Sequence, residues 1–385
     1  MKAFALIAVA AIAVSCGRGP DASGGADREL EAAIAEIEAG RATTPLVAQP
    51  ARGSDATVTF LVRSLAGEVP RIVSDVTGWG ESPDDSSFDL SVAPAARIEY
   101  LVVHGENDYR ADPNNPRLAW TYGGDAVSEL VTPDYLPPPE LADPPVTAGG
   151  RTVEATIDSR ALGRARRALV YLPPGYRSDG AYPVAVFHAG WGVAHDGQAP
   201  RILDWLITRR KIEPIVALFL ESYLDGDDDN HEGPPMRAFL TEEAPAWLAA
   251  RFSVTARADE RAVLAISYGA KDALDAALAP AAAYGRLGLL IPGRRLTRTD
   301  LEAFTAQRDR RLRVAILAGR YDAANLPTAL TAHQTLTAAG HAVDLIEVAE
   351  GHNPTTWRNH LGDVLASLFA DSNVTSTSVR TSRSL

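Results

Sequence analysis

Short apolar runs alternate with helical stretches from about residue 150 onward, and no other feature constrains the fold of this chain as strongly. The apolar runs include RALVYLP, YPVAVFH, RAVLAI, RVAILA and VDLIEV. Between most of them lie helical stretches such as APRILDWLITRRK and TALTAHQTLTAAG. This alternation is typical of a sheet that is covered by helices on both faces. The sequence therefore predicts a doubly wound, mostly parallel α/β fold over residues 150–371.

The preceding part of the chain has a different pattern. Residues 54–136 contain ATVTFLVRS, RIVSDV, SFDLSV and RIEYLVV, separated by turns rich in Gly, Pro, Asp and Ser. Several short strands at this spacing predict a small immunoglobulin-like β-sandwich. A proline-rich linker at 137–149 follows it, and a linker with a short helix at 17–53 precedes it. The polar tail at 372–385 is predicted to be disordered.

The first residues, MKAFALIAVAAIAVSC, combine a positive charge at Lys2 with an apolar run that ends in small residues. This pattern predicts a secretory signal peptide over 1–16. AVSC resembles the bacterial lipobox, in which the cysteine, here Cys16, is acylated. Acylation would anchor the protein to a membrane of the cell envelope, on the periplasmic face. Ordinary cleavage between small residues is the alternative, and it predicts a secreted soluble protein.

The charge balance restricts the partners. The formal net charge of the chain is −12, which argues against a nucleic-acid partner. Its one cysteine permits no intramolecular disulfide. The sequence does not predict the oligomeric state.

A serine lies at one of the strand-to-helix breaks, in the segment VLAISYGAKDAL. Ala265 and Gly269 stand two positions before and two positions after Ser267. A nucleophile elbow needs small residues at both positions, because the backbones of strand and helix nearly touch there. Ser267 is therefore a candidate nucleophile. The alternative is a serine that only caps the helix.

Two later strands end in residues that complete a catalytic triad. RVAILA is followed by GRYDAAN with Asp322, and VDLIEV is followed by AEGHNPTTW with His352. The order Ser, Asp, His and the position after a strand both match a hydrolase built on a parallel sheet. We expect His352 to act as the general base and Asp322 to orient it. Glu350 is a rival acid, but we interpret it as a solvated neighbour.

Ester hydrolysis through a serine also needs donors for the oxyanion. One donor is expected to be the backbone N–H of Tyr268, the residue after the nucleophile. The other is expected from VFHAGWG, with the N–H of Trp191 favoured and Gly190 next to it. We interpret His188 as a structural residue that holds this loop, and His360 as a surface residue. This chemistry requires no cofactor and no metal.

Two charged segments are candidate ligand sites. DGDDDNHEGPP at 225–235 begins like a calcium loop, but it lacks the glycine and the glutamate that such a loop requires, so we interpret it as an exposed acidic loop. RRLTRTD and QRDRRLR place arginines between 294 and 313. Such arginines usually lie on solvated helix faces, although they can attract an anionic substrate.

The chain resembles the enterochelin-esterase-like (esterase D-type) α/β-hydrolases over most of 150–370. The resemblance rests on RRALVYLPPGYRSDGAYPVAVFHAGWG, HDGQ, ISYGA, GRYD and GHNPTTWRNHL. The sequence differs from the family pattern at the elbow, where Ala265 and Ala270 replace glycines. In the first half, VTFLVRS, TGWG, YRADPNNP and SELVTPDYLPPP resemble the early-set domain at the N-terminus of enterochelin esterases.

The resemblance implies an α/β-hydrolase fold and a serine esterase. It implies as substrate either a ferric-siderophore-type ester or a feruloylated or acetylated glycan, which is a small-molecule or glycan partner. The alternative hypothesis is a non-catalytic, glycan-binding surface lipoprotein with a degenerate hydrolase domain. Trp79, Tyr109 and Trp120 are candidate stacking platforms for a glycan, but we interpret them as core or hinge residues.

Overall fold

The computed structural model describes residues 32, 35–37, 39, 44–49, 51–61, 71–80, 87–121, 124–221, 233–305 and 310–370. The chain divides into two compact units, Met1–Tyr135 and Leu136–Leu385. The predicted signal peptide with Cys16, most of the acidic segment at 225–235 and the predicted tail lie outside the described residues. Within the described ranges, no helix is both long and apolar enough to cross a membrane.

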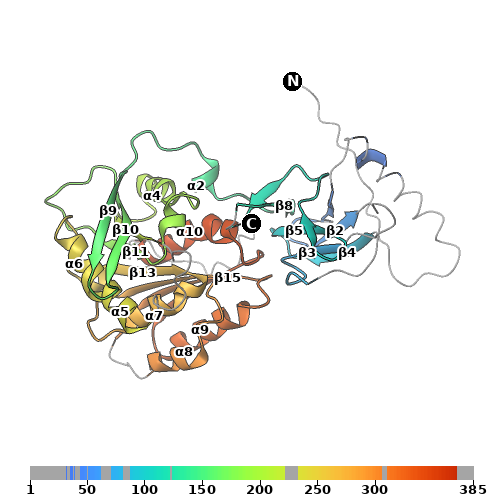
Figure 1. Ribbon diagram of the computed structural model, residues 1–385. Helices are drawn as coiled ribbons and strands as arrows, with labels where there is room; N and C mark the ends of the chain where they lie inside the picture. Colours follow the sequence, from blue (N-terminus) through green and yellow to red (C-terminus); the bar gives the residue numbers. More distant parts are fainter. Residues whose placement is uncertain are drawn as a thin grey trace. The chain divides into compact units, whose positions relative to one another are not determined.

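The second unit is built on an eight-stranded sheet with the order β16-β15-β14-β13-β11-β12-β10-β9 (Figure 1). β10 pairs antiparallel with β9 and β12, and all other neighbours are parallel. The predicted mostly parallel α/β fold is confirmed. The strands are β9 (Arg151–Ser159), β10 (Arg164–Leu172), β11 (Val184–Phe187), β12 (Val216–Leu220), β13 (Arg261–Ile266), β14 (Arg286–Leu290), β15 (Arg313–Gly319) and β16 (Ala342–Val348).

Helices cover both faces of this sheet (Figure 1). Alternate residues of a strand point to opposite faces of the sheet. Val263 accordingly packs in an apolar cluster with the helices α5–α9 on one face. Its neighbour Leu264 packs in a second cluster with α3, α4 and α10 on the other face. The helices are α2 (Pro139–Ala142), α3 (Trp191–Ala194), α4 (Ala199–Thr208), α5 (Pro234–Ala238), the π-helical η1 (Phe239–Glu243), α6 (Ala244–Ala249), the 3₁₀ turns η2 (Ala258–Glu260) and η3 (Ser267–Gly269), α7 (Ala270–Leu278), α8 (Arg298–Thr305), α9 (Leu326–Ala338) and α10 (Pro354–Phe369).

The first unit contains two antiparallel sheets, as predicted for a β-sandwich. One has the order β1-β2-β4 and the other the order β3-β5-β8-β7, with β6 paired to β5. Phe60 and Tyr100 meet edge to face between the sheets, with ring centroids 5.0 Å apart. The strands are β1 (Leu46–Ala48), β2 (Ala56–Leu61), β3 (Arg71–Ser74), β4 (Ser87–Val92), β5 (Arg97–His104), β6 (Asp108–Arg110), β7 (Leu118–Trp120) and β8 (Ala126–Val131).

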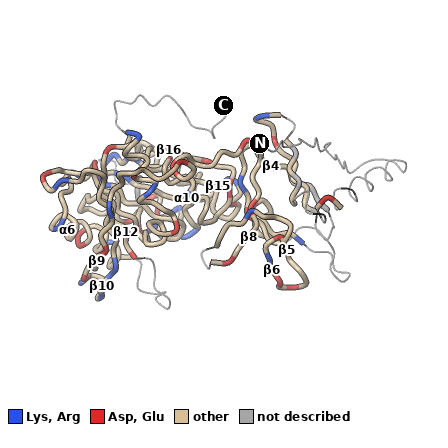
Figure 2. The backbone as a smooth tube through the Cα atoms, turned by 90° about the horizontal axis from the view of Figure 1, so that it is seen from above, with Lys and Arg blue, Asp and Glu red and all other residues tan. Residues whose placement is uncertain are grey.

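The three aromatic residues interpreted as core or hinge residues of this unit are exposed. The exposed fractions are 41% for Trp79, 48% for Tyr109 and 60% for Trp120. Tyr109 and Trp120 lie on the short strands β6 and β7, and Trp79 follows β3 in a turn with φ 63°. The core interpretation of these residues is therefore wrong. Acidic and basic residues are interspersed along both units (Figure 2).

Candidate active site

Ser267 occupies a strained turn between β13 and α7. Its φ of 48° lies in the left-handed region, which is rare for residues other than glycine and is the conformation expected of a nucleophile elbow. An added Cβ on Gly269 would lie 3.2 Å from the Cβ of Ala265, so both positions require small residues. The N-cap of α7 is Gly269, and the helix-cap alternative for Ser267 does not describe this turn.

The structure brings the three predicted triad residues together. Ser267 Oγ lies 2.9 Å from His352 Nε2, and His352 Nδ1 lies 2.5 Å from Asp322 Oδ2. Asp322 follows β15 and is buried, whereas His352 follows β16 and has 24% of its side chain exposed. Because β13, β15 and β16 are parallel, their carboxyl ends meet at one edge of the sheet, where ligands of open α/β sheets bind.

The two hydrogen bonds fix the protonation pattern of His352. A carboxylate oxygen of Asp322 can only accept, so His352 Nδ1 carries a proton and donates it. Nε2 is then the acceptor for the Ser267 hydroxyl. A serine hydroxyl beside an imidazole acceptor, itself oriented by a carboxylate, can be activated as a nucleophile.

Asn325 belongs to this cluster and was missed in the sequence. Its side-chain amide donates to Asp322 Oδ1 over 2.8 Å, and its backbone N–H reaches the same oxygen over 3.2 Å. Its Oδ1 accepts from the backbone N–H of Arg294 over 3.1 Å. The signal was present, since Asn325 ends the segment GRYDAAN and immediately precedes α9 as its N-cap residue.

The loop predicted to supply an oxyanion donor lies beside the elbow. β11 pairs with β13, and the His188 N–H donates to the Leu264 carbonyl over 2.9 Å. Gly190 and Trp191 follow directly, with Trp191 beginning α3. A Cβ on Gly190 would lie 2.5 Å from the Cβ of Phe187, so only glycine fits there.

Tyr268 follows Ser267 in the 3₁₀ turn η3. Its side chain is 58% exposed. Tyr268 is therefore part of the elbow turn, and its ring is largely exposed to solvent.

His188 has the structural role expected of it. Its Nε2 lies 3.1 Å from Asp272 Oδ2, and both side chains are buried. Asp272 is in the first turn of α7, the helix that follows Ser267. The pair therefore connects the loop after β11 to the helix after Ser267, and it fixes this loop relative to α7.

The expectations for Glu350 and His360 are wrong. Glu350 is only 1% exposed, and its Oε1 lies 2.7 Å from His360 Nε2 on α10. It is not a solvated neighbour, because α10 covers it. His360 is 19% exposed and also lies 3.4 Å from Asp363. Burial alone would lower the pKa of His360, but the charge of Glu350 and the hydrogen bonds to Asp363 and Glu350 raise it to about 9.

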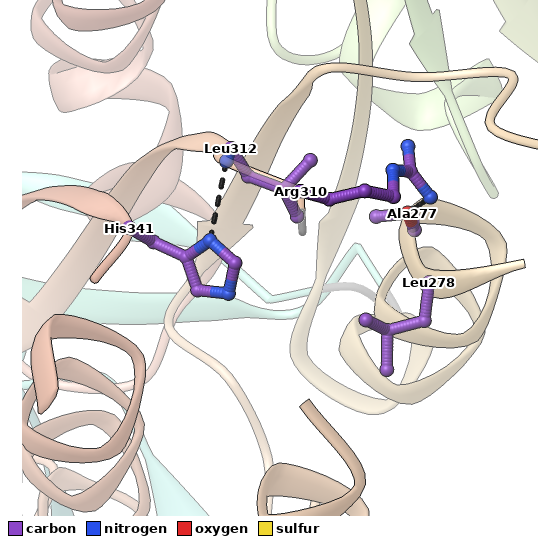
Figure 3. Close-up of a pocket in the computed structure, with 5 residues that line it drawn as sticks. All are labelled: Ala277, Leu278, Arg310, Leu312 and His341. Carbon is purple, nitrogen blue, oxygen red and sulfur yellow. Dashed lines mark hydrogen bonds between the residues drawn. The ribbon is translucent and has the colours of Figure 1, made fainter. Parts of the chain in front are cut away.

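A small hollow elsewhere in the unit is not part of this cluster (Figure 3). Leu312 and His341 immediately precede β15 and β16, so the hollow lies at the edge of the sheet opposite the triad. The N–H of Leu312 donates to His341 Nδ1 over 3.1 Å at this hollow. The hollow is lined by Ala277, Leu278, Arg310, Leu312 and His341.

Among the described residues, no cluster of three or more His, Cys, Asp or Glu could hold a metal ion.

Comparison with known proteins places the chain in a family. The family model Esterase, described as "Putative esterase", matches residues 159–368, which is more than half of the chain. The chain belongs to this esterase family and is a carboxylic-ester hydrolase with an α/β-hydrolase fold. No curated protein sequence matches it significantly.

Solved structures share the fold at low sequence identity. Ferric enterobactin esterase from Salmonella typhimurium is 18% identical, with a TM-score of 0.68, over 84% of this chain and 96% of that one. The enterobactin esterase of Shigella flexneri, determined in the presence of enterobactin, is 21% identical, with a TM-score of 0.66, over 84% of this chain and 95% of that chain. The feruloyl esterase module from Clostridium thermocellum is 14% identical, with a TM-score of 0.51, over 60% and 93%.

The Glu350–His360 pair should make stability depend on pH in one direction. Because the pKa of His360 is raised from 6.5 to about 9 by folding, its contribution is complete below pH 6.5 and is lost as pH rises through about 9. His360→Gln should therefore lower the free energy of unfolding by about 1–3 kcal/mol at pH 6 and by much less at pH 9.5. Urea denaturation at both pH values measures this. A cost that is constant or increases with pH would contradict the assignment.

Proposed function

We propose that the protein is a serine esterase that hydrolyses its substrate through Ser267, His352 and Asp322 and a covalent acyl-enzyme. The observation that carries the proposal is the pair of hydrogen bonds from Ser267 to His352 and from His352 to Asp322. Membership of the esterase family supports the reaction class. The alternative of a non-catalytic glycan-binding protein is not adopted, because all three side chains are in contact in the order that catalysis needs.

In the first half of the reaction, Ser267 Oγ attacks the ester carbonyl carbon while His352 Nε2 takes the hydroxyl proton. The tetrahedral intermediate collapses, the bond to the leaving alcohol breaks, and His352 returns the proton to that alcohol. In the second half, water attacks the acyl-enzyme and His352 takes its proton. The acid is released when His352 protonates Ser267 Oγ. Asp322 holds the imidazole and stabilises its charged form in both halves.

The negative charge on the tetrahedral intermediate needs N–H donors that are in place before the reaction. The backbone N–H groups of Tyr268 and Trp191 are the proposed donors, with Gly190 beside Trp191. Support comes from the hydrogen bond that holds the loop after β11 against β13, and from the His188–Asp272 pair. Both contacts fix the two donor segments relative to each other.

The proposed substrate is a ferric-siderophore-type ester or a feruloylated or acetylated glycan. Enterobactin esterases and a feruloyl esterase module share the fold. The loop after β14 adds a local argument from charge. Gly293 donates its N–H to the Ser267 carbonyl over 3.0 Å, and Arg294 and Arg295 follow it with exposed side chains. The Arg295 guanidinium lies 5.5 Å from the centroid of the Tyr268 ring. Positive charge here favours an ester that carries negative charge.

The proposed location is the cell envelope, with a lipid anchor at Cys16. Support comes from the sequence alone, since the apolar run and the AVSC segment precede the described residues. Labelling with a palmitate analogue in a bacterial host that expresses the full sequence should tag the processed protein, and Cys16→Ser should abolish the tag. A chain that is cleaved and released without a tag would support the secreted alternative.

Removing triad residues should abolish ester hydrolysis without unfolding the protein. Ser267→Ala and His352→Ala should each lower kcat for a 4-nitrophenyl ester by roughly 10⁴-fold or more. The double variant should be no worse than either single variant, because the residues act together. Ser178→Ala, at an exposed serine, is the matched control. Hydrolysis that persists in folded Ser267→Ala would rule out this mechanism.

Arg295 should affect the hydrolysis of charged esters selectively. Arg295→Ala should raise KM about tenfold for a 4-nitrophenyl succinate monoester, because it removes one charge-assisted contact worth about 1.4 kcal/mol. KM for the methyl ester of the same succinate should change much less. Arg298→Ala, at a side chain 84% exposed and paired with Glu302, is the matched control. Equal effects on the two esters would show that Arg295 does not select for charge.

A further inference from the structure

We infer that Asn325 is a positioning residue, which holds the triad carboxylate in place and couples it to the backbone of the nucleophile. The inference rests on the proposed function, since it assigns a role relative to Asp322 and His352. Asn325 is the residue before α9 and follows the turn that carries Asp322. Its side chain contacts both that turn and the loop after β14.

The hydrogen bonds settle which way the amide points. The backbone N–H of Arg294 can only donate, so the atom of Asn325 that faces it over 3.1 Å is the oxygen Oδ1. The amide nitrogen must then face the other way. It lies 2.8 Å from Asp322 Oδ1 and 3.2 Å from His352 Nδ1. Asn325 therefore presents a donor to the carboxylate and an acceptor to the loop.

This arrangement satisfies both oxygens of a buried carboxylate. Asp322 is 5% exposed, and a buried charge is costly unless hydrogen bonds surround it. Oδ2 accepts from His352, and Oδ1 accepts from the amide and the backbone N–H of Asn325. Donors on both oxygens fix the rotation of the carboxylate. The orientation of the imidazole towards Ser267 depends on that rotation.

The contacts close into a ring. Ser267 Oγ meets His352, His352 meets Asp322, and Asp322 meets Asn325. Asn325 then accepts from the Arg294 N–H, and the adjacent Gly293 N–H donates to the Ser267 carbonyl over 3.0 Å. Both the side chain and the backbone of the nucleophile are thereby tied to the same carboxylate.

Replacement by aspartate tests the donor function of the Asn325 amide, because this side chain makes no hydrogen bond that caps α9. Aspartate keeps the size of the side chain and can accept from the Arg294 N–H. In its ionised form it cannot donate to Asp322, and it places a second negative charge beside Asp322 and His352. A residue that only accepted from the Arg294 N–H would tolerate this change. A positioning residue would not, and the added charge would favour the protonated imidazole.

The experiment measures pH–rate profiles of ester hydrolysis for the wild type, Asn325→Asp and Asn325→Ala. We expect Asn325→Asp to lower kcat by on the order of 10²-fold, within the range typical of general-base catalysis. The acidic limb of the pH–rate profile of this variant should move to higher pH by about one unit, while its KM changes little. Asn325→Ala should also lower kcat, without the shift of the acidic limb. Asn114→Asp, the same change at an exposed residue of the first unit, is the matched control.

A double-variant cycle tests whether Asn325 acts through Asp322. In the Asp322→Ala background, Asn325→Ala should cost little further activity, because the carboxylate it positions is gone. Wild-type kcat in folded Asn325→Ala, together with a wild-type pH profile in folded Asn325→Asp, would overturn the inference and leave the triad intact. Persistent activity of Ser267→Ala would instead overturn the proposed function. Circular dichroism and thermal unfolding of each variant separate both results from a loss of fold.

Discussion

The candidate site depends on one strained residue, which lies in the turn where a strand and the following helix come very close together. Ser267 adopts a left-handed conformation at the end of β13, and α7 begins immediately after it. The turn closes only because Ala265 and Gly269 are small enough for the two backbones to meet. The apolar clusters on both faces hold β13 in the middle of the sheet, so the surrounding structure stabilises the strain and leaves the serine hydroxyl at its carboxyl edge.

Parallel strand topology then brings the other groups to that edge. The turns after β15 and β16 supply Asp322 and His352, and the loop after β11 is bound to β13 through the His188 N–H. Hydrogen bonds between loops set the fine geometry. The His188–Asp272 pair fixes one side of the elbow, and the ring through Asn325 and Arg294 fixes the other. A rigid frame with loop-to-loop contacts is what preorganised catalysis requires.

Most of this architecture could be predicted from the sequence, because apolar runs and their order along the chain carry the strand pattern. The positions of Ser267, Asp322 and His352 after three strands also predicted that they would meet. Asn325 lies three residues after Asp322, so its contact with that carboxylate could have been expected from the sequence. Its second partner, the backbone N–H of Arg294, belongs to a different loop, and no side-chain pattern reveals it. Glu350 was expected to be solvated because it lies in a loop, but α10 buries it against His360. The position of a residue in a loop does not indicate whether a helix packs against that residue and buries it.

If Ser267 is the catalytic nucleophile, a reagent that reacts covalently with activated serines should modify it. The purified protein without residues 1–16 would be treated with a fluorophosphonate, and the modified residue mapped by mass spectrometry. We expect a single adduct on Ser267 that forms far more slowly in folded His352→Ala. A folded protein that stays unlabelled, or that is labelled equally well without His352, would contradict it.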